Sequence, residues 1–180
     1  ISPSGRSSIK GRRDEIGVVE ERFGRQQMDV TLPKVYELME RVFNDLLDLA
    51  GPEADHFMTF NDEWWHGART AADAVYKGQT RQDLFHRFLM AEHEILRRRG
   101  IRMVMLTDML HPKHNGGPPF NLAAVAERLP RDIVLATWSE PNGHFAGLGF
   151  KTLWRIDNGF VAHSRKSWPG DTGFGRVQYG

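Results

Sequence analysis

The sequence predicts an α/β domain built on a parallel sheet of about four strands. Stretches with helical spacing of apolar residues alternate along the chain with short apolar runs that are typical of buried strands. Alternation of this kind implies right-handed βαβ units and therefore a parallel sheet. The chain has 180 residues, whereas a complete (β/α)8 barrel needs about 250. We therefore expect a single domain that is either a truncated barrel or a small open α/β sheet.

The first helix is predicted to follow a lead-in with little apolar character. Residues 1–28 mix Ser, Gly and Arg, which predicts a poorly ordered segment, and the folded domain is expected over 29–180. Thr31 and Pro33 open the helix, and its apolar residues recur at three- and four-residue spacing until Gly51 stops it. The chain does not begin with methionine, so we expect a processed product or a fragment.

The most informative stretch follows this helix. An apolar run over 57–61 predicts the first strand of the sheet, and it leads directly into Asp62-Glu63 and Trp64-Trp65. Carboxylates are costly to bury unpaired, and indoles stack well against ring-shaped ligands. In α/β proteins the carboxyl ends of strands hold the chemistry. The stretch predicts a sugar site, with a solvated loop start as the alternative for the acids and core packing for the indoles.

The remaining elements continue the alternation. After a loop over 64–79, Thr80 and Asp83 predict a capping box at the start of a second long helix, and Gly100 ends that helix. The next strand ends at Asp108, whose carboxylate is expected to accept a hydrogen bond either from a sugar hydroxyl or within its own loop. The later elements are predicted in the order strand 101–107, short helix 121–128, strand 133–138, a brief helical turn and strand 150–156.

Composition excludes several classes of function. The formal net charge of +1 argues against a dedicated nucleic-acid binder, and the absence of cysteine excludes disulfides, thiolate metal sites and a cysteine nucleophile. No apolar run approaches the roughly 20 residues that span a bilayer, so we expect no membrane partner. Localisation is left open between the cytoplasm, the periplasm and secretion.

A metal site is not expected either. Asp108, His111 and His114 occur at three-residue spacing, but their Pro- and Gly-rich loop has no helix to align them. Gly116-Gly117 lacks the lysine and hydroxyl of a phosphate-binding loop. We expect neither a metal nor a cofactor.

The order of these elements resembles a known family. A helix that begins near Thr31 and ends at Gly51 precedes a strand that ends in Asp62-Glu63, and further strands follow within 102–109 and 129–138. Over residues 29–160 this order is similar to the catalytic barrel of glycoside hydrolase family 20, the β-N-acetylhexosaminidases and their relatives. The resemblance implies a partial (β/α)8 TIM barrel whose N- and C-terminal parts are missing.

The resemblance also implies a retaining, substrate-assisted hydrolase that removes terminal N-acetylhexosamine residues. In such an enzyme Glu63 would protonate the departing glycosidic oxygen, and Asp62 would orient the 2-acetamido group of the substrate, which attacks the anomeric carbon. The partner would be a carbohydrate. The substrate-binding residues implied are Trp64, Trp65, Asp108 and Trp138.

The sequence departs from the family motif at two positions. The family writes His-x-Gly-x-Asp-Glu, and here Met58 and Phe60 occupy the His and Gly positions. The alternative is therefore a catalytically weak or inactive relative that binds carbohydrate, and a metal-dependent hydrolase using the histidines is a third hypothesis. Because a partial barrel exposes strand edges, we also expect instability or self-association of the isolated chain.

Overall fold

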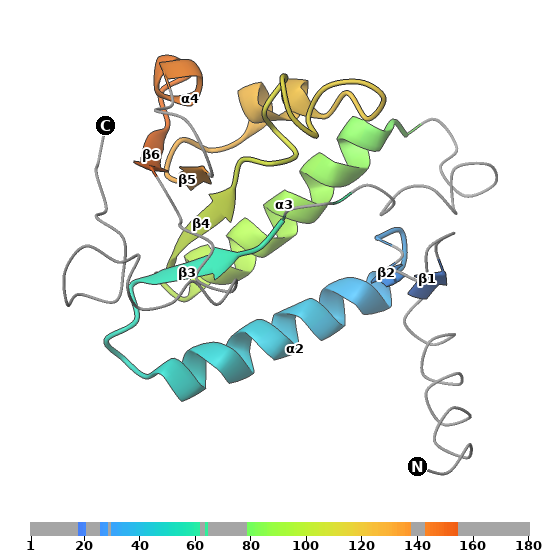
Figure 1. Ribbon diagram of the computed structural model, residues 1–180. Coiled ribbons are helices and arrows are strands. Elements are labelled where there is room, and N and C mark those ends of the chain that lie inside the picture. Colours follow the sequence, from blue (N-terminus) through green and yellow to red (C-terminus); the bar gives the residue numbers. More distant parts are fainter. Residues whose placement is uncertain are drawn as a thin grey trace, which may run out of the picture.

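The described part of the chain folds around one parallel sheet (Figure 1). The computed structural model describes residues 18–20, 26–28, 30–61, 64, 79–137 and 143–154. Its strands are β3 (His56–Thr59), β4 (Arg102–Leu106), β5 (Val134–Thr137) and β6 (Lys151–Trp154). Its helices are α2 (Pro33–Ala50), α3 (Arg81–Arg98), the 3-10 helix η1 (Ala123–Arg128) and the short α4 (Gly143–Gly147).

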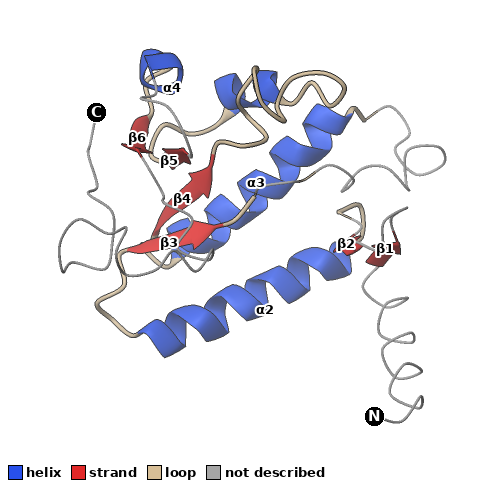
Figure 2. Ribbon diagram, in the orientation of Figure 1, coloured by secondary structure: helices blue, strands red, loops and turns tan. Residues whose placement is uncertain are grey.

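The strand order distinguishes between the two expected architectures. The four strands pair in parallel in the order β3-β4-β5-β6, so each strand lies beside the next one in the sequence. A doubly wound open sheet reverses its strand order at a switch point, whereas a barrel does not. Helix α3 packs on one face of this sheet and contacts both α2 and η1 (Figure 2). The fold is α/β with helices alternating with parallel strands, consistent with part of a TIM barrel.

The two long helices form where their sequences predicted them. Pro33 occupies the first turn of α2, where a missing N–H costs nothing, and Gly51 ends the helix with φ of 83°. At the start of α3, the Thr80 hydroxyl accepts a hydrogen bond from the Asp83 N–H, and the Asp83 carboxylate accepts one from the Thr80 N–H. The predicted capping box is therefore confirmed. Gly100, with φ of 71°, follows the end of α3.

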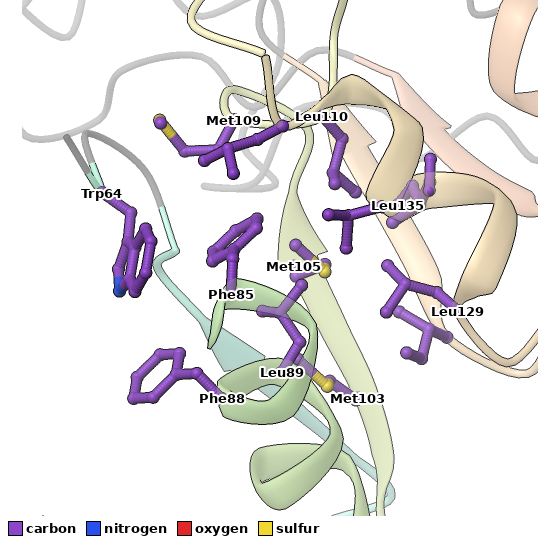
Figure 3. Close-up of a cluster of buried hydrophobic side chains, with 14 of the residues drawn as sticks. Trp64, Phe85, Phe88, Leu89, Met103, Met105, Met109, Leu110, Leu129 and Leu135 are labelled. Atoms are coloured by element: carbon purple, nitrogen blue, oxygen red, sulfur yellow. The ribbon is translucent and has the colours of Figure 1, made fainter. Parts of the chain in front are cut away.

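The main core lies between α3 and the sheet (Figure 3). Phe85 and Leu89 of α3 face Met103 and Met105 of β4, with Leu135 of β5 beside them. All five side chains are fully buried. Methionine suits this surface because its unbranched side chain adapts to irregular gaps between a helix and a twisted sheet.

The other face of the sheet is apolar as well. Because side chains alternate across a strand, residues between those of the main core point the opposite way. They form a second cluster of buried residues made of Val104, Leu106, Val134 and Ala136, with Met58 and Leu153 packed against it. Burial on both faces is the pattern that the apolar strand sequences predicted.

The N-terminal segment contains a pair of short strands that the sequence did not predict. Sequence analysis expected a poorly ordered lead-in over 1–28, but β1 (Val18–Glu20) pairs antiparallel with β2 (Gln26–Met28). Strands of three residues are too short for their side chains to show a periodic pattern.

The predicted loop over 64–79 and the segment after residue 154 fall almost entirely outside the described residues. No described helix combines the length and the apolar character needed to cross a membrane.

We predict that the capping box contributes measurably to the stability of the fold, which one substitution tests. Thr80→Ala removes the hydroxyl that satisfies the Asp83 N–H and should lower the free energy of unfolding by about 1 kcal/mol, as measured by urea denaturation. Thr80→Ser keeps the hydroxyl and serves as the matched control. An equal loss in both variants would assign the effect to the threonine methyl group instead of the cap.

Candidate functional site

The candidate site lies where β3 and β4 end. Parallel pairing places Thr59 beside Met105, so the carboxyl ends of these two strands are adjacent. Asp62 and Glu63 follow β3 after two intervening residues, but both lie outside the described residues, as do Trp65 and Trp138. The described part of the site consists of Thr59 at the end of β3, Asn61 and Trp64 after it, the carboxyl group of Glu92 on α3, and the loop after β4.

A buried polar cluster closes the end of β3. The Asn61 side-chain amide donates one hydrogen bond of 2.6 Å to the Glu92 carboxyl group and another of 2.8 Å to the Thr59 hydroxyl. These three side chains are 4–6% exposed. Glu92 belongs to the buried face of α3, so this cluster ties the helix to the residue that precedes Asp62. We call Thr59, Asn61 and Glu92 the Asn61 cluster.

Sequence reasoning missed Glu92, although a signal was present. On α3, Glu92 falls between the buried pair Phe88 and Leu89 and the buried pair Ile95 and Leu96. At helical spacing this position lies on the apolar face. An acidic residue there is a marker of a buried polar contact, because an unpaired buried carboxylate is very costly.

The protonation state of Glu92 follows from its surroundings. Burial disfavours the charged carboxylate and raises the pKa of Glu92 from 4.5 to about 8, and the hydrogen bonds from Asn61 and Thr59 offset only part of this effect. The Glu92 carboxyl group is therefore predominantly neutral at pH 7. A neutral carboxyl both accepts and donates, which suits a cluster that also contains an amide and a hydroxyl.

We predict a pH dependence of stability that originates at Glu92. The folded protein binds this proton more tightly than the unfolded chain, so the stabilisation is complete below pH 4.5 and is lost as pH rises to about 8. Glu92→Gln cannot ionise and should remove most of this decline. Urea denaturation at pH values between 5 and 8.5 measures it.

The matched control for this measurement is Glu94→Gln. Glu94 is exposed on the same helix, and its hydrogen bond to Arg97 lowers its pKa. The control should retain the decline of the parent protein. A Glu92→Gln variant with the same decline as the parent would show that the Glu92 carboxyl is already ionised at neutral pH.

The carboxylate of Asp108 organises the loop after β4. Asp108 is 4% exposed, and its two oxygens accept hydrogen bonds of 3.1 Å and 2.9 Å from the Asn115 amide. One of them also lies 2.5 Å from Nδ1 of His114, whose side chain is 58% exposed. These contacts correspond to the loop role that sequence analysis weighed against a sugar contact. They leave an imidazole at the surface of the site, oriented by a buried carboxylate.

The histidines of this loop do not form a metal site in the described residues. His111 Nδ1 accepts a hydrogen bond from the Lys113 N–H, and its ring lies edge-on to His144 and Phe145. Among the residues that the structure describes, no group of three or more His, Asp or Glu side chains is arranged to bind a metal ion.

Trp64 occupies the core. Its side chain is 7% exposed, and its ring centroid lies 4.8 Å from that of Phe85 and 6.2 Å from that of Phe88 (Figure 3). The structure thus gives Trp64 the packing role that was the alternative to ligand stacking. Of the two adjacent indoles for which the sequence suggested ligand stacking, Trp65 is then the one left for that role.

The two departures from the family motif have different surroundings. Met58 packs against the apolar cluster on the sheet face opposite α3, beside Val104 with which it is paired. Phe60 is 55% exposed. The position at which the family has a histidine therefore holds an apolar side chain within an apolar surface.

Comparisons with known proteins agree with this topology. The sequence matches no protein-family model and no curated protein. Among solved structures, the fold is similar to that of the chitobiase of Flavobacterium johnsoniae (FjGH20), with a TM-score of 0.50 and 19% identity over 72% of this chain. It is also similar to Dispersin B, with a TM-score of 0.50 and 15% identity over 81% of this chain.

This fold resembles the family 20 glycoside hydrolase fold. The similarity that the order of the sequence elements predicted is confirmed for the fold. The chain spans 19% of the chitobiase and 41% of Dispersin B. At these identities the comparison shows the architecture.

Proposed function

We propose that this chain forms part of the catalytic domain of a glycoside hydrolase that removes terminal N-acetylhexosamine residues. The observation that carries the proposal is the place of Asp62-Glu63 in the chain. The pair lies two residues after the end of β3, the first strand of a four-stranded parallel sheet whose fold is similar to that of a family 20 chitobiase. In barrels of this kind, catalytic residues follow the carboxyl ends of strands.

In the proposed reaction, the substrate supplies its own nucleophile. Asp62 orients the 2-acetamido group, whose oxygen attacks the anomeric carbon while Glu63 donates a proton to the departing glycosidic oxygen. Water then opens the cyclic intermediate, and Glu63 takes up the proton of that water. Two successive inversions retain the configuration of the anomeric carbon.

The residue types suit this division of roles. Glu63 must be protonated when substrate binds, and a neighbouring negative charge on Asp62 favours the protonated form. A general acid that is protonated when substrate binds can work near neutral pH.

The proposed sugar contacts come from several strand ends. Trp138 follows β5 and Trp65 follows β3, and both supply flat apolar surfaces for the face of a sugar ring. Asp108 follows β4 and would accept a hydrogen bond from a sugar hydroxyl beside its loop contacts. Trp64 contributes from the core, where it holds the segment after β3 against α3.

A second candidate function follows from Met58 and Phe60. An apolar Met58 at the histidine position of the motif cannot donate a hydrogen bond to substrate or to the catalytic pair. A relative that binds carbohydrate with weak or no hydrolysis is therefore the alternative within the same class of fold.

We predict that Glu63→Gln separates these two functions. In the full-length protein, hydrolysis of a chromogenic N-acetyl-β-glucosaminide should fall by about 10²–10⁴-fold, because glutamine has no proton to give to the leaving group. Glu37→Gln, an exposed glutamate of α2, is the matched control and should retain parent activity.

The outcomes discriminate clearly. Loss confined to Glu63→Gln supports the hydrolase. No hydrolysis by the parent, together with saturable binding of N-acetylglucosamine in calorimetry, would favour the binding relative. A parent protein that neither hydrolyses the substrate nor binds the sugar would contradict both functions.

A further inference from the structure

The Asn61 cluster lies where β3 leads into the proposed catalytic pair. Asn61 is the last described residue before Asp62, and its amide donates to Glu92 at 2.6 Å and to the Thr59 hydroxyl at 2.8 Å. The Thr59 hydroxyl also lies 3.4 Å from the carbonyl oxygen of Val104 on β4. Through the side chains of Asn61 and Thr59, hydrogen bonds thus connect the end of β3 with both α3 and β4.

Such a cluster contributes more to orientation than to stability. Replacing both buried polar partners by apolar residues of similar size is often neutral or stabilising, so leucines at positions 61 and 92 together would serve the core as well. An apolar side chain makes no directional hydrogen bond and therefore would not fix the orientation of its neighbours. Two hydrogen bonds from one amide fix the side-chain torsions of Asn61 and, through them, the position of its backbone.

We propose that Glu92 is a positioning residue for the proposed site: its buried carboxyl group holds Asn61, and Asn61 fixes the backbone that leads into Asp62 and Glu63. The inference rests on the proposed function for its catalytic consequence. Its structural part, the anchoring of the end of β3 by α3, stands independently. Glu92 contacts neither substrate nor reacting atoms in this proposal.

The expected consequence is loss of turnover without loss of binding. A displacement of about 1 Å in a catalytic group costs up to about 10²-fold in rate. Releasing Asn61 should therefore lower kcat, while KM, which depends on the strand ends around the sugar, changes little. A purely structural role for Glu92 would instead move stability alone.

The first experiment measures anchoring without any assay of activity. Amide hydrogen exchange at pH 7 is followed in the peptide over 57–64 and, as an internal reference, in the peptide over 134–137. In Glu92→Leu, exchange in 57–64 should rise at least about tenfold relative to the reference, because local opening of that segment is no longer opposed by the hydrogen bond. Glu92→Gln still accepts from Asn61 and should resemble the parent.

Two further variants control for a non-specific effect of the substitution and for a general loss of stability. Glu94→Leu makes the same change at an exposed position of α3 and should leave both peptides unchanged. The double variant Asn61→Leu/Glu92→Leu replaces both partners by apolar groups, which preserves the fold where the single variant is unstable. It should unfold at a urea concentration near that of the parent but still show faster exchange over 57–64.

The second experiment measures kcat and KM of the same variants in the full-length protein. Glu92→Leu and the double variant should lose at least about tenfold in kcat, with Glu92→Gln and Glu94→Leu at parent values. Inactivity of the parent would refute the proposed function, and the exchange experiment would still decide the anchoring. Unchanged relative exchange in both the Glu92→Leu and the double variant, or kcat unchanged in the double variant of an active parent, would overturn the positioning role.

Discussion

The packing of α3 against β4 and β5 is the interaction on which the rest of the described structure depends. The fully buried side chains of Phe85 and Leu89 cover Met103 and Met105, and α3 also contacts α2 and η1. Each fully buried side chain of this size contributes about 1.5–3 kcal/mol. Because the helix spans the face of the sheet, it also determines where the strand ends meet the loops that follow them.

Within this apolar surface, Glu92 is the one described residue of α3 that breaks the hydrophobic pattern with an acid. The desolvation of its carboxyl group is unfavourable, and a protein gains little stability by keeping it. Positions at which a sequence departs from its own local pattern are often linked to function. Here the departure lies under the strand that leads to the proposed catalytic pair, which is why Asn61 and Glu92 carry the functional inference.

Much of the fold could be predicted from the sequence because its signals are local. The caps of α3 at Thr80 and Asp83, the proline in the first turn of α2 and the apolar strands all act over a few residues. The hydrogen bond between Asn61 and Glu92 joins residues 31 positions apart, and nothing in either neighbourhood specifies its partner. The burial of Trp64 also depends on distant residues of α3. Before these contacts are known, two adjacent indoles indicate a ligand site as well as they indicate a packed core.

The order of the strands has a consequence for how the chain folds. The loop that closes each parallel pair becomes shorter along the sequence: Met58 pairs with Val104, Val104 with Val134, and Val134 with Lys151. Shorter loops cost less entropy to close. Pairing should therefore start at β5 and β6 and proceed toward β3, so that the strand bearing the proposed catalytic pair joins the sheet last. In this order, β3, which leads into the proposed catalytic pair, stays unpaired until β4, β5 and β6 have formed the rest of the sheet.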